Sequence, residues 1–333
     1  MKKSIYLVFL MIATAGCVVS CNDEWKEEQF VQMPSFKASP NTEGVTFCYV
    51  RYNAAGKMRF DLPIIVSGST PNSIDRTIHL GLDTDTLAKL NQEQYGHRSE
   101  LYFKQLESKY YSMPLVVDVP ANVSTVTVPI DFTLGDLDQS DKWLLPLQIL
   151  DEPNYNYIAN PHKHYRRAML RITPFNDYSG EYGGTLYKIY LEGDNEPLTL
   201  NTHRTFVVDE QTLFLYAGLR DIDFLDRKNY KVFIKFTDDK IDLQKKKLEI
   251  WSDNSENNKF KVGEQQSYYT IDEAWDAQRP YMKHVYITLY LSYEFEDYTA
   301  IPGQRLKYRV EGTLSMQRDL NTLIPDEDQQ IQW

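Results

Sequence analysis

The strongest constraint on the fold is a long run of strict alternation near the end of the chain. Between Lys283 and Phe295, polar positions alternate with apolar ones. The apolar set consists of Ile287, Leu289, Leu291, Tyr293 and Phe295. A period of two places each set on one face of a strand, so the pattern predicts a half-buried antiparallel strand. A second long β-rich run, 306–316, follows it, and consecutive long strands favour an up-and-down meander.

The first half of the chain also has the pattern of short strands separated by turns. The β-rich runs are 45–52, 58–66, 76–82, 115–119, 125–132, 143–150 and 168–172. About seven such strands predict an immunoglobulin-like β-sandwich over residues 43–174, and the short segment 53–56 is expected to be a hairpin loop between the first two strands. Residues 85–105 are the exception, because Leu87, Leu90, Tyr95 and Leu101 recur at helical spacing and predict one or two short helices.

The second half, residues 175–322, is predicted to be a separate antiparallel β domain. Turn-forming residues at 174–180 mark the boundary. Shorter strands are expected at 184–191, 205–208, 212–217, 231–237 and 247–251. A calycin- or lipocalin-like barrel and a second sandwich both fit this pattern. The chain is therefore expected to be all-β, with an acidic, extended tail at 323–333.

The N-terminal segment 1–21 has the features of a lipoprotein signal. A basic start precedes an uncharged apolar run that is too short for a membrane-spanning helix. The segment 18–21 resembles a bacterial lipobox, and Cys21 is expected to carry the lipid. Cys17 is a weaker alternative, because Thr14 is polar where the motif needs an aliphatic residue. Residues 22–42 are expected to be a tether that holds the folded part away from the membrane.

Charge and cysteine content exclude several classes of function. The net charge of −11 argues against binding to nucleic acid or to an anionic membrane, because both need basic patches. With Cys17 removed and Cys21 lipidated, Cys48 has no partner for a disulfide. Cys48 lies in an apolar run, so we expect a buried, unreactive thiol.

Motifs for catalysis, cofactors and metals give no candidate site. The chain has no Gly-x-Ser-x-Gly elbow and no phosphate-binding glycine loop. His162 and His164 lack a third zinc ligand. The acidic segments 83–85 and 136–141 lack the glycine and the terminal glutamate of a calcium loop, so helix caps and solvated turns are expected there. We therefore expect no enzyme activity, no cofactor and no metal.

Seven segments spread over the mature chain carry a resemblance to a known family. They are 21–25, 63–70, 142–147, 175–180, 293–299, 312–318 and 324–330. In these segments the chain resembles the small surface lipoproteins of Bacteroides polysaccharide-utilisation loci, which are encoded beside an outer-membrane transporter and its SusD-like lid. The acidic residues after Cys21 also resemble the surface-export signal of Bacteroidetes lipoproteins. The resemblance implies a lipid-anchored protein on the outside of the outer membrane that binds glycan for a SusC/SusD-like transporter, and it supplies no catalytic residues.

Glycan recognition needs exposed aromatic rings beside polar side chains, because sugars present both apolar C–H faces and hydroxyl groups. Two segments that read as polar loops, 251–258 and 268–281, combine these groups densely. The candidate glycan-binding residues are Trp251, Asp253, Asn254, Tyr268, Tyr269, Trp275, Arg279 and Tyr281. Two other functions stay open. An exposed apolar patch without polar partners would indicate a structural or adhesin-like protein, and a cleft with two carboxylates of perturbed pKa would indicate a glycan hydrolase.

Overall fold

The computed structural model describes residues 27–53, 58–135 and 137–333. The signal segment 1–21, the lipidation at Cys21 and the start of the predicted tether lie outside the described residues. No helix in the described part of the chain combines the length and the apolar character that crossing a bilayer requires.

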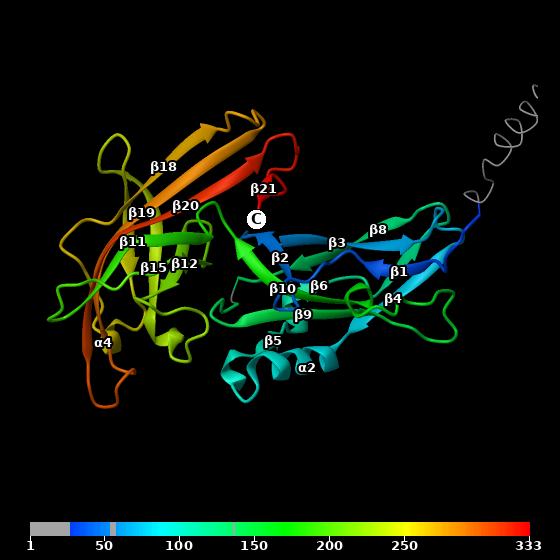
Figure 1. Ribbon diagram of the computed structural model, residues 1–333, viewed down its shortest axis with the longest axis horizontal. Coiled ribbons are helices and arrows are strands. Elements are labelled where there is room, and N and C mark those ends of the chain that lie inside the picture. The colour runs from blue at the N-terminus through cyan, green and yellow to red at the C-terminus, as the bar shows by residue number, and fades with distance from the viewer. Residues whose placement is uncertain (1–26, 54–57, 136) are drawn as a thin grey trace, which may run out of the picture.

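Residues 33–175 form two facing sheets, which confirms the predicted all-β fold (Figure 1). The first sheet has the order β1(Met33–Phe36), β3(Met58–Ser67), β8(Thr125–Phe132), β6(Tyr111–Ser112). The second has the order β2(Thr46–Arg51), β10(Arg167–Phe175), β9(Lys142–Ile149), β4(Arg76–Leu82), β7(Val116–Val119), with β5(Phe103–Gln105) paired to β9. Alternate residues such as Leu62, Ile64 and Val66 on β3 are buried in the core between the sheets. Cys48 is fully buried there, and burial raises the pKa of its thiol well above the ordinary value.

The predicted hairpin between the first two strands is wrong. β2 pairs in parallel with β10, whereas β3 pairs with β1 and β8 in the opposite sheet. The alternation in both strands is real, but their apolar faces meet across the core instead of lying side by side. A sequence pattern gives the face that a strand buries and not the strand with which it pairs.

Part of the predicted tether is folded against the sandwich. β1 runs antiparallel to β3 from Met33 to Phe36. Just before it, the Glu28 carboxylate accepts hydrogen bonds from the backbone N–H of Ser69 and of Thr70, at 2.8 and 2.9 Å. These donors hold the pKa of Glu28 well below its ordinary value. The segment reads as polar because its polar side chains bind the backbone of the 67–70 turn, and sequence alone assigns such residues to solvent.

Residues 181–332 form one antiparallel sheet of eleven strands that curls around its own core as an open half-barrel. The path is β12(Thr202–Arg204), β11(Glu181–Leu191), β20(Leu306–Asn321), β19(Met282–Asp297), β18(Tyr268–Trp275), β16(Lys246–Trp251), β15(Lys231–Lys240), β14(Thr212–Tyr216), β13(Phe206–Val207). Two short strands flank it, β17(Lys261–Val262) on β19 and β21(Ile331–Gln332) on β20. This is the barrel alternative in an open form and not a second two-sheet sandwich.

The alternation predicted for residues 283–295 is confirmed in β19. Ile287, Leu289, Leu291, Tyr293 and Phe295 all lie in the half-barrel core with 2% exposure or less. β19 and β20 have 16 residues each and pair along their whole length. By contrast, β18 occupies residues that read as a polar loop, because beyond Tyr269 all its side chains but Thr270 are exposed.

The helices among the described residues are short and lie outside the sheets. They are α2(Thr84–Tyr95), α3(Lys163–Arg166) and α4(Ser255–Asn258), with 3₁₀ turns η2(Ser99–Leu101), η3(Ser108–Tyr110) and η4(Arg227–Tyr230). α2 and η2 confirm the helical segment predicted at 85–105. The Asp83 side chain caps α2 by accepting a hydrogen bond from the backbone N–H of Thr86, which confirms the helix-cap interpretation of that acidic segment.

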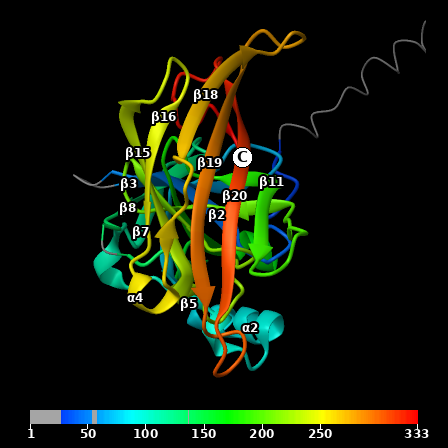
Figure 2. The same ribbon diagram turned by 90° about the vertical axis from the view of Figure 1, so that its left-hand side faces the viewer.

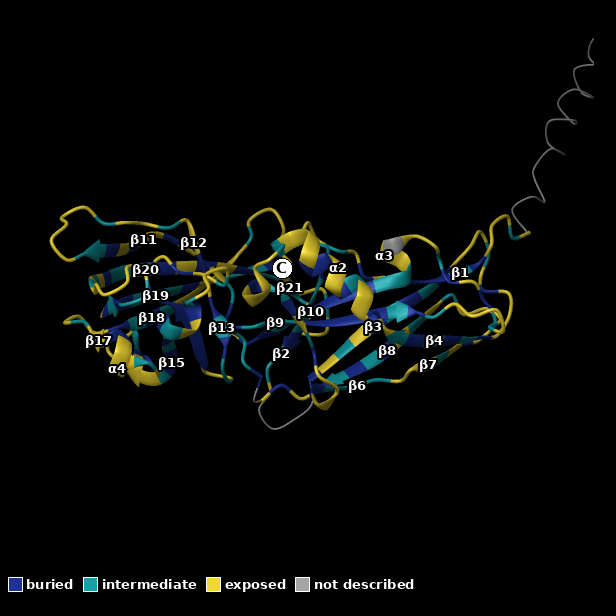
Figure 3. Ribbon diagram, turned by 90° about the horizontal axis from the view of Figure 1, so that it is seen from below, coloured by how far each residue is buried: buried dark blue, intermediate teal, exposed yellow. Residues whose placement is uncertain are grey.

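The two halves lie end to end, and the end of the chain returns to their junction (Figures 1 and 3). The predicted extended tail is wrong for its last residues, because β21 joins the half-barrel sheet. Trp333 then stacks on Tyr49 of the sandwich. The tail is acidic in composition, but its last two apolar residues, Ile331 and Trp333, pack at the junction.

Candidate ligand-binding cleft

A cavity of about 280 Å³ lies at the junction of the two halves and is open to solvent on one side. β2 and β10 of the sandwich and β13, β20 and β21 of the half-barrel contribute to its walls. Its aromatic lining consists of Phe47, Tyr49, Trp143, Phe175, Phe206 and Trp333. Domain junctions are a common location for small-molecule sites, and aromatic walls are typical of them. We refer to this cavity as the cleft.

The alternation of β2 places two rings in the cleft. Cys48 and Val50 point into the sandwich core, so Phe47 and Tyr49 lie on the other face of the strand. Their ring centroids are 5.6 Å apart with planes 21° from parallel. β2 is the last strand of its sheet, and the half-barrel does not cover these rings completely.

Trp333 lies flat on Tyr49, with ring centroids 3.9 Å apart and planes 1° from parallel. Its edge also meets the ring of Phe175 at 4.9 Å. Trp333 is 54% exposed, so much of the indole remains available to solvent. Tyr49 itself is partly buried, and this burial raises the pKa of its phenol.

Two buried arginines fix the polar side of the cleft. The Arg171 guanidinium lies 5.3 Å from the Phe47 ring and forms an ion pair with Glu43 at 3.1 Å. Burial lowers the pKa of Arg171, and the Glu43 carboxylate opposes that shift. Arg318 donates hydrogen bonds to the carbonyl oxygens of Asn176, Asp177 and Ser179 in the connection between the halves. These guanidinium groups are held rigidly, so the shape of the cleft is largely formed in the free protein.

A more exposed ion pair lies at the rim. Arg204 and Glu181 are 3.6 Å apart, and both are about half exposed. Together with Phe206 and Ile222, they line both the cleft and an adjoining cavity of about 300 Å³. A solvated ion pair of this kind contributes little to stability. The guanidinium N–H donors and carboxylate oxygens that the pair leaves exposed are available to a polar ligand.

The predicted candidates are not brought together. Trp251 ends β16, is 40% exposed and stacks on Phe233 at 5.4 Å. Trp275 ends β18 and is 61% exposed. The two strands are paired only at Lys246–Tyr269 and Lys247–Tyr268, so they diverge and the two tryptophans lie at opposite ends of the sheet. They also face opposite sides, because Trp251 alternates with the buried Ile250 whereas Trp275 shares the parity of the buried Tyr269.

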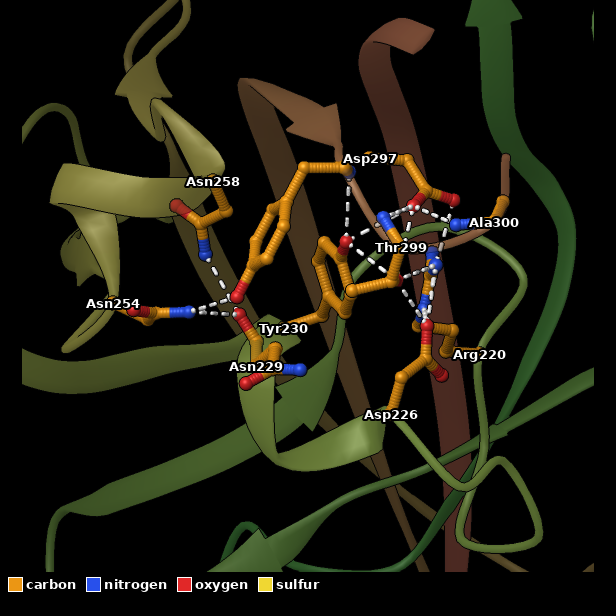
Figure 4. A network of polar contacts seen from close by, with 10 residues as sticks. Arg220, Asp226, Asn229, Tyr230, Asn254, Asn258, Asp297, Thr299 and Ala300 are labelled. Atoms are coloured by element: carbon orange, nitrogen blue, oxygen red, sulfur yellow. Dashed lines mark hydrogen bonds and ion pairs between the residues drawn. The ribbon is translucent and has the colours of Figure 1, made fainter. Parts of the chain in front are cut away.

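Asn254 belongs to a network that closes one end of the half-barrel (Figure 4). Its side-chain amide donates to the Asn229 carbonyl at 3.1 Å and to the Tyr298 hydroxyl at 3.0 Å. In the same network Arg220 forms an ion pair with Asp297 at 2.6 Å. Hydrogen bonds with Arg220 and backbone N–H groups outweigh burial and lower the pKa of Asp297 to about 2. All these polar groups have partners, so the network is structural. Asp253 beside it is exposed.

The remaining candidates divide between the core and the surface. Tyr269 is 2% exposed and donates its hydroxyl hydrogen to the Thr237 carbonyl, so it is a core residue. Arg279 forms an ion pair with Asp276 at 3.0 Å in the β18–β19 turn, and Tyr281 is partly exposed next to it. Tyr268 stacks on Tyr290 on the outer face of the sheet. Ligand contact by the exposed candidates stays a prediction.

The sequence reasoning missed the rings of the cleft. Phe47 and Tyr49 alternate with Cys48 and Val50, so a one-sided aromatic pair was visible in the sequence. It was interpreted as part of an apolar strand, because nothing in the sequence shows that β2 is an edge strand. Trp333 approaches Tyr49 across 284 residues, 333 minus 49, and no local pattern predicts that contact.

Comparisons with known proteins agree with this architecture. A family described as a domain of unknown function, DUF4973, matches residues 25–153, and a family described as a C-terminal domain matches residues 166–315. A Bacteroides ovatus protein of unknown function is 39% identical, covers 91% of this chain and all of its own, and has a TM-score of 0.81. A second one from the same species is 40% identical over 92% of this chain and 97% of its own, with a TM-score of 0.79.

A third solved structure has a descriptive name. It is an auxiliary nutrient binding protein from Bacteroides thetaiotaomicron, 35% identical over 88% of this chain and 97% of its own, with a TM-score of 0.79. No functionally curated protein matches the chain significantly.

Proposed function

This chain belongs to the same family of Bacteroides proteins as those solved structures, and from this premise we propose that it binds a nutrient without catalysis. The ligand that we propose is a glycan, of which one or two sugar units enter the cleft. The observation that carries the proposal is the combination, in one cavity between the halves, of stacked aromatic rings with rigid and rim arginines.

The chemistry of the cleft matches that of a sugar. Trp333, which is 54% exposed, offers apolar surface to C–H groups on the outside of the stack that it forms with Tyr49 and Phe47. Arg204 donates hydrogen bonds, and Glu181 accepts them from hydroxyl groups. A volume of about 280 Å³ is at the small end of the range for ligand sites, which favours one or two rings over a longer chain. The name of the 35% identical relative, an auxiliary nutrient binding protein, supports a role in nutrient capture.

The proposed setting is the outer face of the outer membrane. The lipobox at Cys21 and the acidic residues after it support a lipid anchor, and the resemblance to polysaccharide-utilisation proteins supports a SusC/SusD-like transporter as the recipient of the glycan. Tethering beside that transporter would raise the effective concentration of the binding site, so weak affinity would suffice.

The test is a binding measurement on residues 22–333 with three variants. Soluble polysaccharides and their oligosaccharides are screened by affinity gel electrophoresis and by calorimetry. We expect Tyr49→Ala and Arg204→Ala each to weaken oligosaccharide binding by about tenfold, equivalent to about 1.4 kcal/mol. Trp275→Ala is the control, because it removes an exposed ring that does not line the cleft.

Three outcomes contradict the proposal. Binding that is lost in Trp275→Ala and kept in the two cleft variants places the site on the residues that the sequence predicted. A released product shows a hydrolase. No retention by any glycan favours a structural role. Circular dichroism of each variant separates loss of binding from loss of folding.

A further inference from the structure

The outer face of the half-barrel sheet changes character along its length. Toward one end of β19 and β20, the outward positions and those of neighbouring β11 carry charges. They are Lys188, Glu294, Glu296, Lys307, Arg309 and Glu311. Several are paired, as in Arg309–Glu311 at 2.6 Å. This is the alternating-sign ladder that is expected of a solvated surface.

The other half of the same face is almost uncharged. Figure 2 shows β18, β19 and β20 side by side there. Their outward residues in two adjacent rows are Tyr268, Thr270, Thr288, Tyr290, Thr313 and Ser315. Tyr286 and Gln317 continue the face beyond them, with Asp272 at the β18 margin. Small hydroxyl groups thus form a floor between Tyr290 and Tyr286. We name this surface the tyrosine platform.

The Tyr268 ring is covered by Lys245 and Tyr290, whereas the Tyr290 ring is stacked on one face and its hydroxyl donates a hydrogen bond to Gln265. The Lys245 ammonium lies 4.7 Å from the Tyr268 ring, and Tyr268 stacks on Tyr290 at 5.1 Å and 13°. The next outward residue in this row is Thr313, which is small. No further ring or cation meets Tyr290 in the described part of the chain. In the charged half, by contrast, Arg309 covers the ring of Tyr190 at 4.4 Å.

We propose that the tyrosine platform binds a neutral polysaccharide chain, with one sugar ring on the free face of Tyr290 and the chain running over the hydroxyl floor toward Tyr286. Tyr286 and Tyr290 are four residues apart, about 13 Å at about 3.3 Å per residue. That length leaves room for more than one sugar unit. The inference rests on the proposed function and specifies its ligand class, and Gln317 belongs both to this face and to the cleft wall.

The charge pattern identifies the ligand as neutral. The two central rows of the platform carry no charged side chain, and the charged groups lie at its margin, with Lys245 on the Tyr268 ring and Asp272 on β18. The net charge of −11 further disfavours anionic chains. Hydroxyl, amide and phenol groups bind neutral sugars through hydrogen bonds and stacking.

The experiment uses native gels that contain amylopectin, galactomannan, yeast mannan or barley β-glucan, with polygalacturonate as the anionic comparison. Ser315→Glu places a carboxylate in the exposed floor without touching the core, and Tyr290→Ala removes the free ring. Lys188→Gln in the charged half is the matched control, because it changes the net charge by the same −1 as Ser315→Glu. Arg204→Ala reports on the cleft. Mobilities are normalised to gels without polysaccharide.

We expect at least one neutral polysaccharide to retard the parent, with apparent affinity reduced fivefold or more by Ser315→Glu and Tyr290→Ala and unchanged by Lys188→Gln. If only Arg204→Ala reduces the retardation, the platform is not the binding site and the proposal for the cleft stands. Retardation that is sensitive only to the platform variants overturns the cleft and leaves the platform. No retardation by any neutral polysaccharide, or retardation by polygalacturonate alone, overturns the platform, and calorimetry with oligosaccharides then decides on the cleft separately.

Discussion

In the N-terminal half, two sheets of short strands face each other across one core, whereas in the C-terminal half a single sheet curls around a core of its own. The longest strand of the first half, β3, has 10 residues, and β19 and β20 of the second have 16 each. The same alternation therefore gives a compact support in one half and long free faces in the other. The long strands give the C-terminal half an extended outer face, on which the proposed platform lies, whereas the proposed cleft uses the short edge strand β2 of the first half.

The first prediction breaks the connection between the halves and has the largest expected effect. Arg227 is buried and donates hydrogen bonds to the Ser140 carbonyl at 3.0 Å and to the Glu100 carbonyl at 3.4 Å, both in the sandwich. Arg227→Ala leaves the buried Ser140 carbonyl unpaired and should lower the free energy of unfolding by about 2–4 kcal/mol. Calorimetric unfolding should then split into two transitions.

The adjacent Lys228 is the control for Arg227. Lys228 is partly exposed and forms ion pairs with Asp138 and Asp141 at 3.3 and 3.1 Å. Exposed pairs contribute about 1 kcal/mol or less, so Lys228→Ala should leave one transition near that of the parent. A single, unshifted transition in Arg227→Ala would show that the halves are coupled through other contacts.

The second prediction compares the two halves by the pH dependence of their stability, and its expected effect is smaller. In the half-barrel, the imidazole Nδ1 of His284 lies 2.7 Å from the Asp319 carboxylate and Nε2 lies 3.3 Å from that of Asp276. The hydrogen bond with Asp319 is the main cause that raises the pKa of His284. Its contribution to stability is full below the unfolded pKa of about 6.5 and is lost as pH rises through the folded pKa.

Glu28 on the sandwich should behave in the opposite way. Backbone donors, first Ser69, lower its pKa, so its contribution is full above the unfolded value of about 4.3 and is lost as pH falls toward the folded pKa. Both pH dependences are checked by melting temperatures between pH 3 and pH 9, measured for the parent, His284→Gln and Glu28→Gln. The deficit of His284→Gln should vanish at high pH, and that of Glu28→Gln should decrease as the pH falls from 5 to 3. Deficits that do not change with pH would contradict the assigned charges.

Local periodicity accounts for what the sequence could predict. Alternation placed β19 and its buried face correctly, and helical spacing located α2. Alternation did not predict β18, because Asp272, Glu273 and other exposed residues continue this strand beyond the core that it covers. A strand without a buried face carries no apolar period.

Long-range pairing accounts for what the sequence could not predict. The partner of β2 is β10, more than a hundred residues away, and the cleft exists only because Trp333 returns to Tyr49. The sequence prediction of a sugar site relied on the density of rings and polar groups in segments 251–258 and 268–281, and that density does not bring Trp251 and Trp275 together in space. Topology decided which rings meet.

The most direct test of the account is hydrogen–deuterium exchange of the parent with and without a short oligosaccharide of the retained polysaccharide. We expect exchange to slow in the peptides that cover 46–51, 202–207 and 331–333, because these segments line the cleft. Slowing confined to 251–258 and 268–281, or no slowing under conditions in which calorimetry shows binding, would contradict the assignment of the cleft as the binding site.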